Sequence, residues 1–243
     1  MTPTTLLPIT DLDTYIATRD ALHRVAEHVL APVRYADDRG IRLTAYPGGF
    51  GTPPLSDGRR VRVDGTTIVI DALDGTKMAE LDTIGSAAAF VGVEPGLPSG
   101  LYQPATSFVA DAPLLLDAQS AAVLAAWYAL TAGAIERFAA EVADASPSAL
   151  VLWPEHFDQA ISTEDADERA RANYGASPGD KGHPEPYVYV GPWSPVDPAD
   201  PFWNATHFNG AVLPMSALVS SANPADDVLA FLRAGRQKLT NRP

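Results

Sequence analysis

The chain has 243 residues, of which 46% are hydrophobic and 19% are charged, so it is long enough to bury a core and too apolar to be disordered. Its formal net charge of -13 repels phosphate backbones and anionic lipid, which excludes nucleic acid and membrane surfaces as expected partners. It has no cysteine, which rules out disulfides, thiol nucleophiles and Cys-ligated zinc and favours a cytoplasmic location.

A helix is predicted over Leu12–Val33, because apolar residues recur there at three- and four-residue steps, and Pro32 is expected to end or kink it. Arg19 and His23 lie in or beside its apolar face. One interpretation is that both side chains face a pocket. The interpretation that we favour is that Arg19 extends to solvent and His23 makes a local hydrogen bond. The two histidines of HRVAEH are five residues apart, so they should diverge on an α-helix.

Short strands with turn signals are predicted next, beginning with Ile41–Tyr46. Arg60–Ile70 alternates arginine with valine and turns at Asp64-Gly65, which is typical of a hairpin with a type I′ turn. Asp74-Gly75 indicates a second hairpin turn, between strands over 66–72 and 76–83. These signals favour antiparallel pairing over repeated βαβ units.

The middle and end of the chain are predicted to be helical in three places. Gly85–Val93 is small and apolar, and it fits either a short helix or a buried strand. Asp117 is expected to cap a long helix that ends near Val142. The uncharged part of that helix reaches the lower length limit for a membrane span, but its alanine-rich composition favours a buried core helix. A final helix is predicted over Pro224–Leu239.

The segment from Leu150 to Trp193 holds the candidate site, because it gathers His, carboxylate and aromatic residues around Gly and Pro. Leu150–Ile161 is interpreted as one strand, on which His156 and Asp158 share a face. His183 and Glu185 are also two residues apart, in a stretch that Pro184 and Pro186 bias toward extended backbone. If the two stretches lie side by side, two imidazoles and two carboxylates meet.

Two kinds of chemistry fit this set of side chains, and the sequence leaves both open. In a metal-free pocket His156 acts as general base, Asp158 orients it, and the ligand is lined by the remaining candidates, which are His183, Glu185, Tyr187, Tyr189, Trp193 and Trp203. In a mononuclear metal site the four ligands are His156, Asp158, His183 and Glu185, with Asp180, Glu155 and His207 in reserve. A purely structural role, with a rigid turn at His183–Pro186 and core aromatics, is the third alternative.

The segments LWPEHFD, NYGASPGD and HPEPYVYVGPW resemble an uncharacterised protein family from actinobacteria, which pairs a WPEHFD segment with an EPYxYVGPW segment. High Ala, Pro, Asp and Arg with low Lys fit such a source. The resemblance is most specific over Leu152–Trp193. It implies no activity, cofactor or partner, so no catalytic role comes from it.

The sequence therefore predicts an α+β fold, with a mostly antiparallel sheet, two long helices and a C-terminal helix, in a single domain over residues 1–243 with a possible subdomain break near 144–148. The favoured function is binding of, or catalysis on, an unknown small molecule. A non-enzymatic protein that forms a homodimer or larger homo-oligomer is the alternative, and no cofactor is assigned.

Overall fold

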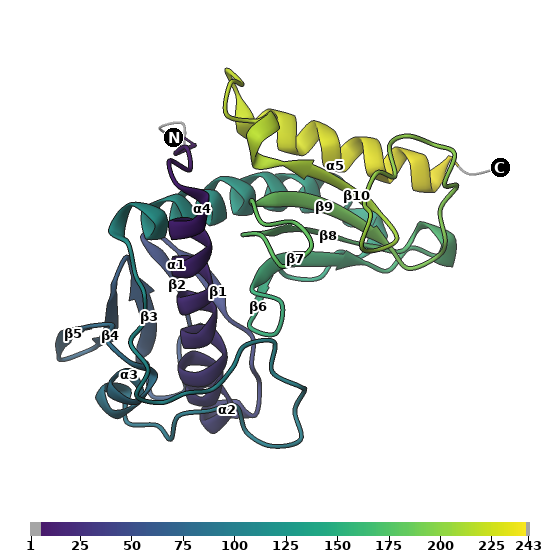
Figure 1. Cartoon of the computed structure of the whole chain (residues 1–243). Coiled ribbons are helices and arrows are strands. Elements are labelled where there is room, and N and C mark those ends of the chain that lie inside the picture. Colours follow the sequence, from purple (N-terminus) through teal and green to yellow (C-terminus); the bar gives the residue numbers. More distant parts are fainter. Residues whose placement is uncertain (1–5, 242–243) are drawn as a thin grey trace. The chain divides into compact units, whose positions relative to one another are not determined.

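The computed structural model describes residues 6–241, and these form two compact units. The N-terminal unit consists of Leu7–Tyr128 and Leu152–Phe157, and the C-terminal unit of Leu6, Ala129–Val151 and residues 158–241. Each unit has a five-stranded sheet whose consecutive strands are antiparallel (Figure 1). The predicted α+β fold with antiparallel sheets is confirmed.

The first helix of the N-terminal unit changes its hydrogen-bonding pattern in the middle. α1 (Leu12–Val25) passes through a π-helical turn, η1 (Ala26–Leu30), into α2 (Ala31–Asp38). Pro32 has no backbone N–H, and it lies in the first turn of α2, where the missing donor is tolerated. The helical run therefore passes the predicted end at Val33 and stops at Asp38.

The N-terminal sheet follows sequence order, because every connection is a hairpin or a short loop. Its strands, in spatial order, are β1 (Thr44–Tyr46), β2 (Gly49–Gly51), β3 (Arg60–Asp64), β4 (Thr67–Ala72) and β5 (Gly75–Glu80). Both predicted hairpins are confirmed, but the type I′ turn predicted for the first is wrong, because its loop is Gly65-Thr66 and only Gly65, with a φ of 61°, has the positive φ that this turn needs at both positions. Between the alternatives for the next segment, the structure shows a helix, α3 (Ile84–Val91), with a capping box at Thr83.

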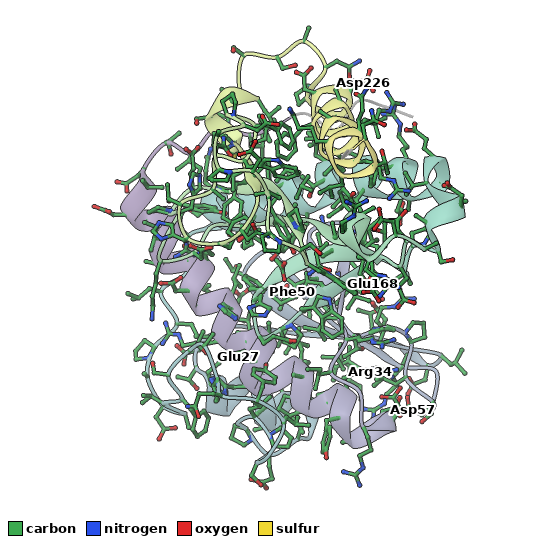
Figure 2. The ribbon with its side chains drawn as sticks, turned by 90° about the vertical axis from the view of Figure 1, so that its right-hand side faces the viewer. Glu27, Arg34, Phe50, Asp57, Glu168 and Asp226 are labelled. Atoms are coloured by element: carbon green, nitrogen blue, oxygen red, sulfur yellow. The ribbon has the colours of Figure 1, made fainter. Side chains whose placement is uncertain are left out.

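The core of the N-terminal unit is an aromatic cluster between helix and sheet. Phe50 and Phe157 meet edge to face with ring centroids 4.9 Å apart, and Tyr128 donates from its hydroxyl to the Phe157 carbonyl at 2.5 Å. Figure 2 shows Phe50 in the interior and Asp57 at the periphery of the unit. Ring pairs of this kind stabilise by about 0.5–1.5 kcal/mol beyond their buried area.

α4 (Ala118–Glu141) is the long apolar helix that the sequence predicts, with Asp117 accepting the backbone N–H of Ser120 at 2.8 Å. Among the described helices it is the one long and apolar enough to cross a membrane, by length and composition alone. The structure buries 61% of its apolar window, as a core helix requires.

The C-terminal sheet has the strand order β10-β9-β8-β7-β6, with bounds β6 (Val151–Trp153), β7 (Asp158–Thr163), β8 (Ala172–Ser177), β9 (Tyr187–Pro192) and β10 (Ala211–Pro214). Short 3₁₀ turns lie between these elements at Ala143–Ala145, Glu168–Ala170 and Met215–Ala217. The predicted C-terminal helix is confirmed as α5 (Pro224–Thr240), and Figure 1 shows it running along this sheet.

The single strand that the sequence predicts over Leu150–Ile161 is wrong. β6 ends at Trp153, and a turn over 154–157 separates it from β7, which begins at Asp158. Phe157 has a φ of 54°, a left-handed conformation that no strand continues through, and its N–H bonds back to the Trp153 carbonyl at 2.7 Å. His156 and Asp158 therefore do not share a strand face.

The C-terminal sheet has one face toward helices and one polar face. On the helix side Tyr174 packs on Phe138 of α4 at 4.6 Å between ring centroids, and Gly235 of α5 meets Val190. Because side chains alternate along a strand and the register is known, the opposite face carries Asp158, Gly175, Tyr187 and Tyr189. We call these four residues the tyrosine face.

Candidate functional site

Two tyrosine–carboxylate pairs lie next to each other on the tyrosine face. The Tyr189 hydroxyl donates to the Asp158 carboxylate, and the Tyr187 hydroxyl donates to Asp180 Oδ2 at 2.5 Å. The two tyrosine rings are two residues apart on β9, so they point the same way, with centroids 6.2 Å apart. Each phenol is fixed by a charged acceptor, which gives a hydrogen bond stronger than a neutral one.

Gly175 makes room for the first of these pairs. It lies opposite Tyr189 in the register of β8 and β9, and a Cβ at this position would be 2.6 Å from Tyr189 Cζ. The tyrosine ring therefore lies across the neighbouring strand, and only glycine allows that close approach.

The loop before β9 adds an imidazole to the tyrosine face. Asp180 Oδ1 accepts the backbone N–H of His183 at 2.8 Å, and the His183 ring meets Tyr187 edge to face at 4.9 Å between centroids. His183 Nε2 is 3.9 Å from Glu185 Oε1, and Glu185 is itself held by the backbone N–H of Ser216 at 2.9 Å. Within residues 6–241 the buried His183 Nε2 has no hydrogen-bond partner.

Both phenols on this face stay protonated at neutral pH. Burial is the largest cause that raises the pKa of Tyr189, followed by the negative charge of Asp158. Burial also raises the pKa of Tyr187, and its hydrogen bond to Asp180 acts in the same direction. Each phenol gives its one proton to a carboxylate, so its oxygen can act only as an acceptor, and the Tyr187 oxygen already accepts from the Ser177 hydroxyl.

The remaining candidates from the sequence lie elsewhere. His156 is an exposed residue in the 154–157 turn of the N-terminal unit, whereas Asp158 belongs to the C-terminal unit. Trp193 is 52% exposed and donates from Nε1 to Asn173, and Trp203 meets Phe202 edge to face. The His207 ring lies against Gly182, where a Cβ would be 2.7 Å from His207 Cδ2.

The predicted metal alternative has no structural counterpart in the described part of the chain. Across residues 6–241, no group of three or more His, Cys, Asp or Glu side chains is arranged to hold a metal ion. His183 and Glu185 do lie together, and Asp180 is tied to Tyr187 and to the backbone of the same loop. The arrangement resembles a hydrogen-bonding site more than a metal centre.

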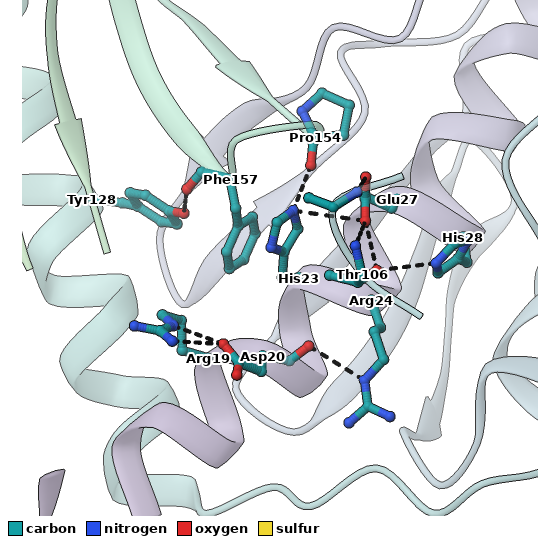
Figure 3. A network of polar contacts seen from close by, with 11 residues as sticks. Arg19, Asp20, His23, Arg24, Glu27, His28, Thr106, Tyr128, Pro154 and Phe157 are labelled. Carbon is teal, nitrogen blue, oxygen red and sulfur yellow. Dashed lines mark hydrogen bonds and ion pairs between the residues drawn. The ribbon is translucent and has the colours of Figure 1, made fainter. Parts of the chain in front are cut away.

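A second polar cluster, which the sequence does not predict, lies in the N-terminal unit on the π-helical turn. Glu27 is 0% exposed, and its carboxylate accepts from Ala105 N at 3.0 Å, Thr106 N at 2.8 Å and Thr106 Oγ1 at 2.5 Å. His28 Nε2 is 3.0 Å from the same Thr106 hydroxyl (Figure 3). Since that hydroxyl donates to Glu27, His28 Nε2 must donate to its oxygen.

His23 and Arg19 both differ from the favoured prediction. His23 Nε2 donates to the Pro154 carbonyl at 2.7 Å, and its ring stacks on Phe157 at 5.0 Å, so its partners come from a distant segment (Figure 3). Arg19 is buried and binds Asp20, with Nη2 2.7 Å from Oδ1, so the expectation that it reaches solvent is wrong. His23 Nε2 is also 3.9 Å from Glu27 Oε2.

The sequence indicates the cluster around Glu27 only in part. Glu27 follows His23 by four residues, which places both on one side of a helix. The π turn moves His28 relative to a regular α-helix, and π turns are frequent at functional sites. Nothing in the loop around Thr106 indicates that it closes on the helix, because that contact spans 79 residues.

Comparisons of the whole chain with protein-family models, with curated proteins and with solved structures found no match.

Proposed function

We propose that the protein binds a small polar molecule at the tyrosine face, with Tyr187, Tyr189, His183 and Glu185 as its contacts. The observation that supports this most is the set of two phenols fixed by carboxylates beside an imidazole whose buried nitrogen has no partner. Fixed polar groups of this kind lose little side-chain entropy when a ligand binds.

The chemistry of the four contacts favours a neutral ligand with hydroxyl or amide groups. The two phenol oxygens can only accept, since their protons are used, and His183 Nε2 adds a donor or an acceptor according to its tautomer. Two carboxylates next to the phenols disfavour an anionic ligand. The ring edges of Tyr187 and Phe208 supply apolar contact beside these groups.

A catalytic version of the same proposal uses His183 as general base and Glu185 to orient it. Their 3.9 Å separation is longer than a hydrogen bond, and such pairs often shorten only when substrate is bound. The pair that the sequence predicts, His156 with Asp158, stays a prediction. Replacing His156 and His183 separately by alanine distinguishes the two versions, because only one variant should lose activity.

The test is a thermal-shift and isothermal-titration screen of neutral polar metabolites, after elemental analysis of the purified protein. We expect a ligand that raises the melting temperature of the wild type and binds at least tenfold more weakly to Tyr187→Phe and His183→Ala. Tyr35→Phe is the matched control, since Tyr35 lies in the N-terminal unit and should leave binding unchanged. Equal binding by all four proteins would refute a site on the tyrosine face.

A homo-oligomer is a second candidate, and one observation favours it. β5 ends the order of the N-terminal sheet and is almost fully exposed, with Met78 67% exposed and Leu73 in the preceding turn 98% exposed. An exposed edge strand can pair with the same edge of another copy. Light scattering should then show a dimer that Met78→Lys converts to monomer.

The absence of cysteine supports the cytoplasm as the proposed location.

A further inference from the structure

We propose that Asn209 is a site of spontaneous deamidation, and that this modification releases the 193–210 loop from the tyrosine face. The loop joins β9 to β10, and all of it belongs to the C-terminal unit. The chemical step does not depend on the function proposed above. Its effect on ligand binding does rest on that function, so the two need separate measurements.

The Asn209 side chain anchors this loop to the end of β9. Nδ2 donates to the carbonyls of Pro192 and Ser194 at 2.9 Å each, and Oδ1 accepts the backbone N–H of Val196 at 3.2 Å. Donating twice and accepting once from one planar group requires an amide. The residue is nevertheless exposed, so water and hydroxide reach it.

The residue that follows Asn209 has to be glycine. A Cβ at Gly210 would be 2.3 Å from the Val190 carbonyl oxygen and 2.5 Å from Phe208 Cε2. Within residues 6–241 the Gly210 N–H has no hydrogen-bond partner, so its nitrogen is not engaged elsewhere. The fold thus requires asparagine and glycine in succession for two separate reasons. Because glycine has no Cβ, it leaves the asparagine amide open to attack by the next backbone nitrogen.

The reaction consumes one water molecule and releases ammonia. The Gly210 nitrogen loses its proton to hydroxide and attacks Cγ of Asn209, and the bond from Cγ to Nδ2 breaks. The departing nitrogen takes a proton from water and leaves as ammonia, and a five-membered succinimide remains. Water then adds to one of the two succinimide carbonyl carbons and opens the ring. Position 209 becomes aspartate or isoaspartate, with one more negative charge than asparagine.

Either product breaks the anchor at position 209. A carboxylate has no N–H to donate, so the carbonyls of Pro192 and Ser194 lose their donor and face a negative charge. Isoaspartate also adds a methylene group to the main chain just before β10. The closed loop therefore loses stability relative to an open one.

The two residues before Asn209 lie against the tyrosine face. The Phe208 ring meets Tyr189 edge to face with centroids 6.0 Å apart, and the His207 ring lies against Gly182. Release at position 209 moves both rings away from the face.

The earlier part of the loop has anchors of its own, which limits the movement to 205–209. The Asn204 side chain pairs with both backbone groups of Val212, accepting from its N–H at 2.8 Å and donating to its carbonyl at 3.1 Å. Asp200 binds Lys238 of α5 at 2.6 Å. Asn204 also serves as an internal control, because the Cβ of Ala205 hinders the same attack there.

Mass spectrometry of digests tests the modification, after the full chain has been incubated in mildly alkaline buffer with and without denaturing urea. We expect a gain of about 1 Da at Asn209 in both samples and none at Asn204. The folded sample should react more slowly, since its amide is anchored. An equal gain at Asn204, or no gain at Asn209 of the folded chain over about ten half-lives of the unfolded reaction, would overturn the assignment.

Hydrogen–deuterium exchange tests the release of the loop with Asn209→Asp. The N–H of Ala205 donates to the Gly210 carbonyl at 3.1 Å and should exchange about tenfold faster in this variant. Gln119→Glu is the matched control, because it makes the same change from amide to carboxylate at an exposed residue of the other unit. Equal exchange in the wild type and both variants would show that the loop stays closed.

Ligand binding tests the link to the tyrosine face. A ligand found for this face should bind Asn209→Asp about threefold or more weakly than the wild type, because the Phe208 contact is lost. Unchanged affinity refutes the link between loop and site. Failure to find any ligand refutes the proposed function, whereas the mass gain and the exchange rate decide the deamidation by themselves.

Discussion

Single side chains decide how the loop around Thr106 is held, and Glu27 is the clearest of them. Glu27→Gln keeps the size but replaces one acceptor oxygen by an NH₂ group, which faces either Ala105 N–H or the two donors of Thr106. We expect the free energy of unfolding to fall by about 1–3 kcal/mol, because a buried donor is left unpaired. Urea unfolding measures this, with exposed Glu94→Gln as control; equal stabilities would mean that the network does not hold the loop.

Phe157 is a second residue that is important for stability, because its ring contacts those of Phe50, Tyr128 and His23. Phe157→Ala leaves a cavity in the aromatic cluster and should lower the free energy of unfolding by about 3–5 kcal/mol. Phe157→Leu should cost clearly less. Chemical denaturation checks both, against Phe208→Ala at a ring that is 38% exposed. A small effect of Phe157→Ala would show that the cluster relaxes around the missing ring.

The sequence predicts the tyrosine face better than the cluster on the π turn, for a physical reason. Tyr187 and Tyr189 are two residues apart in a clear strand, so their common face follows from backbone alternation. His183 and Glu185 follow from local chain stiffness near proline. Glu27 meets Thr106 only through tertiary folding over 79 residues, and local patterns carry no information about such a contact.

At the scale of elements, the tyrosine face depends on how closely β8 approaches the Tyr189 ring. Gly175→Ala places a methyl group 2.6 Å from Tyr189 Cζ, so the ring must move away from Asp158. We expect a loss of about 1–3 kcal/mol in the free energy of unfolding. Ultraviolet titration should also show a lower pKa for Tyr189, since burial and then the Asp158 charge raise it in the wild type. An unchanged titration would mean that Tyr189 keeps its place.

Gly133→Ala is the opposite test, because glycine has no structural reason to be in α4. A Cβ there meets nothing within 4 Å, and alanine has a higher helix propensity than glycine by about 0.5–1 kcal/mol. The variant should melt higher than the wild type in differential scanning calorimetry. A lower melting temperature would show that the position contacts something when the chain is folded in solution.

Elements with strong local signals are predicted well, and those that depend on one backbone torsion are not. The two hairpins follow from Asp-Gly turns between β-branched residues, and α5 follows from helical periodicity. The turn at 154–157 depends on the left-handed backbone conformation of Phe157, which bulky residues seldom adopt. The sequence of this segment therefore predicts one continuous strand. The π turn leaves no local pattern either, apart from the proline that follows it.

For the whole molecule, ion pairs at the surface set the response to acid below pH 4. Hydrogen bonds from arginine lower the pKa of Asp71 and of Glu141, and one from Lys238 lowers that of Asp200. A carboxyl whose folded pKa is lowered stabilises the protein above its unfolded pKa, near 4, and loses this contribution as pH falls through the folded value. Because these pairs are partly exposed, each contributes little and salt should weaken them further.

The histidines at positions 23 and 28 should give a separate response between pH 7 and 5. Burial lowers the pKa of His23 and of His28 below the unfolded value of 6.5, so the unfolded chain binds protons first as pH falls. Stability is therefore complete above about pH 6.5 and declines below it. Urea unfolding at pH 7.5 and 5.5 should show this decline in the wild type and a smaller one in His23→Gln and His28→Gln. Exposed His156→Gln should keep the wild-type decline, and a pH-independent wild type would contradict neutral, buried imidazoles.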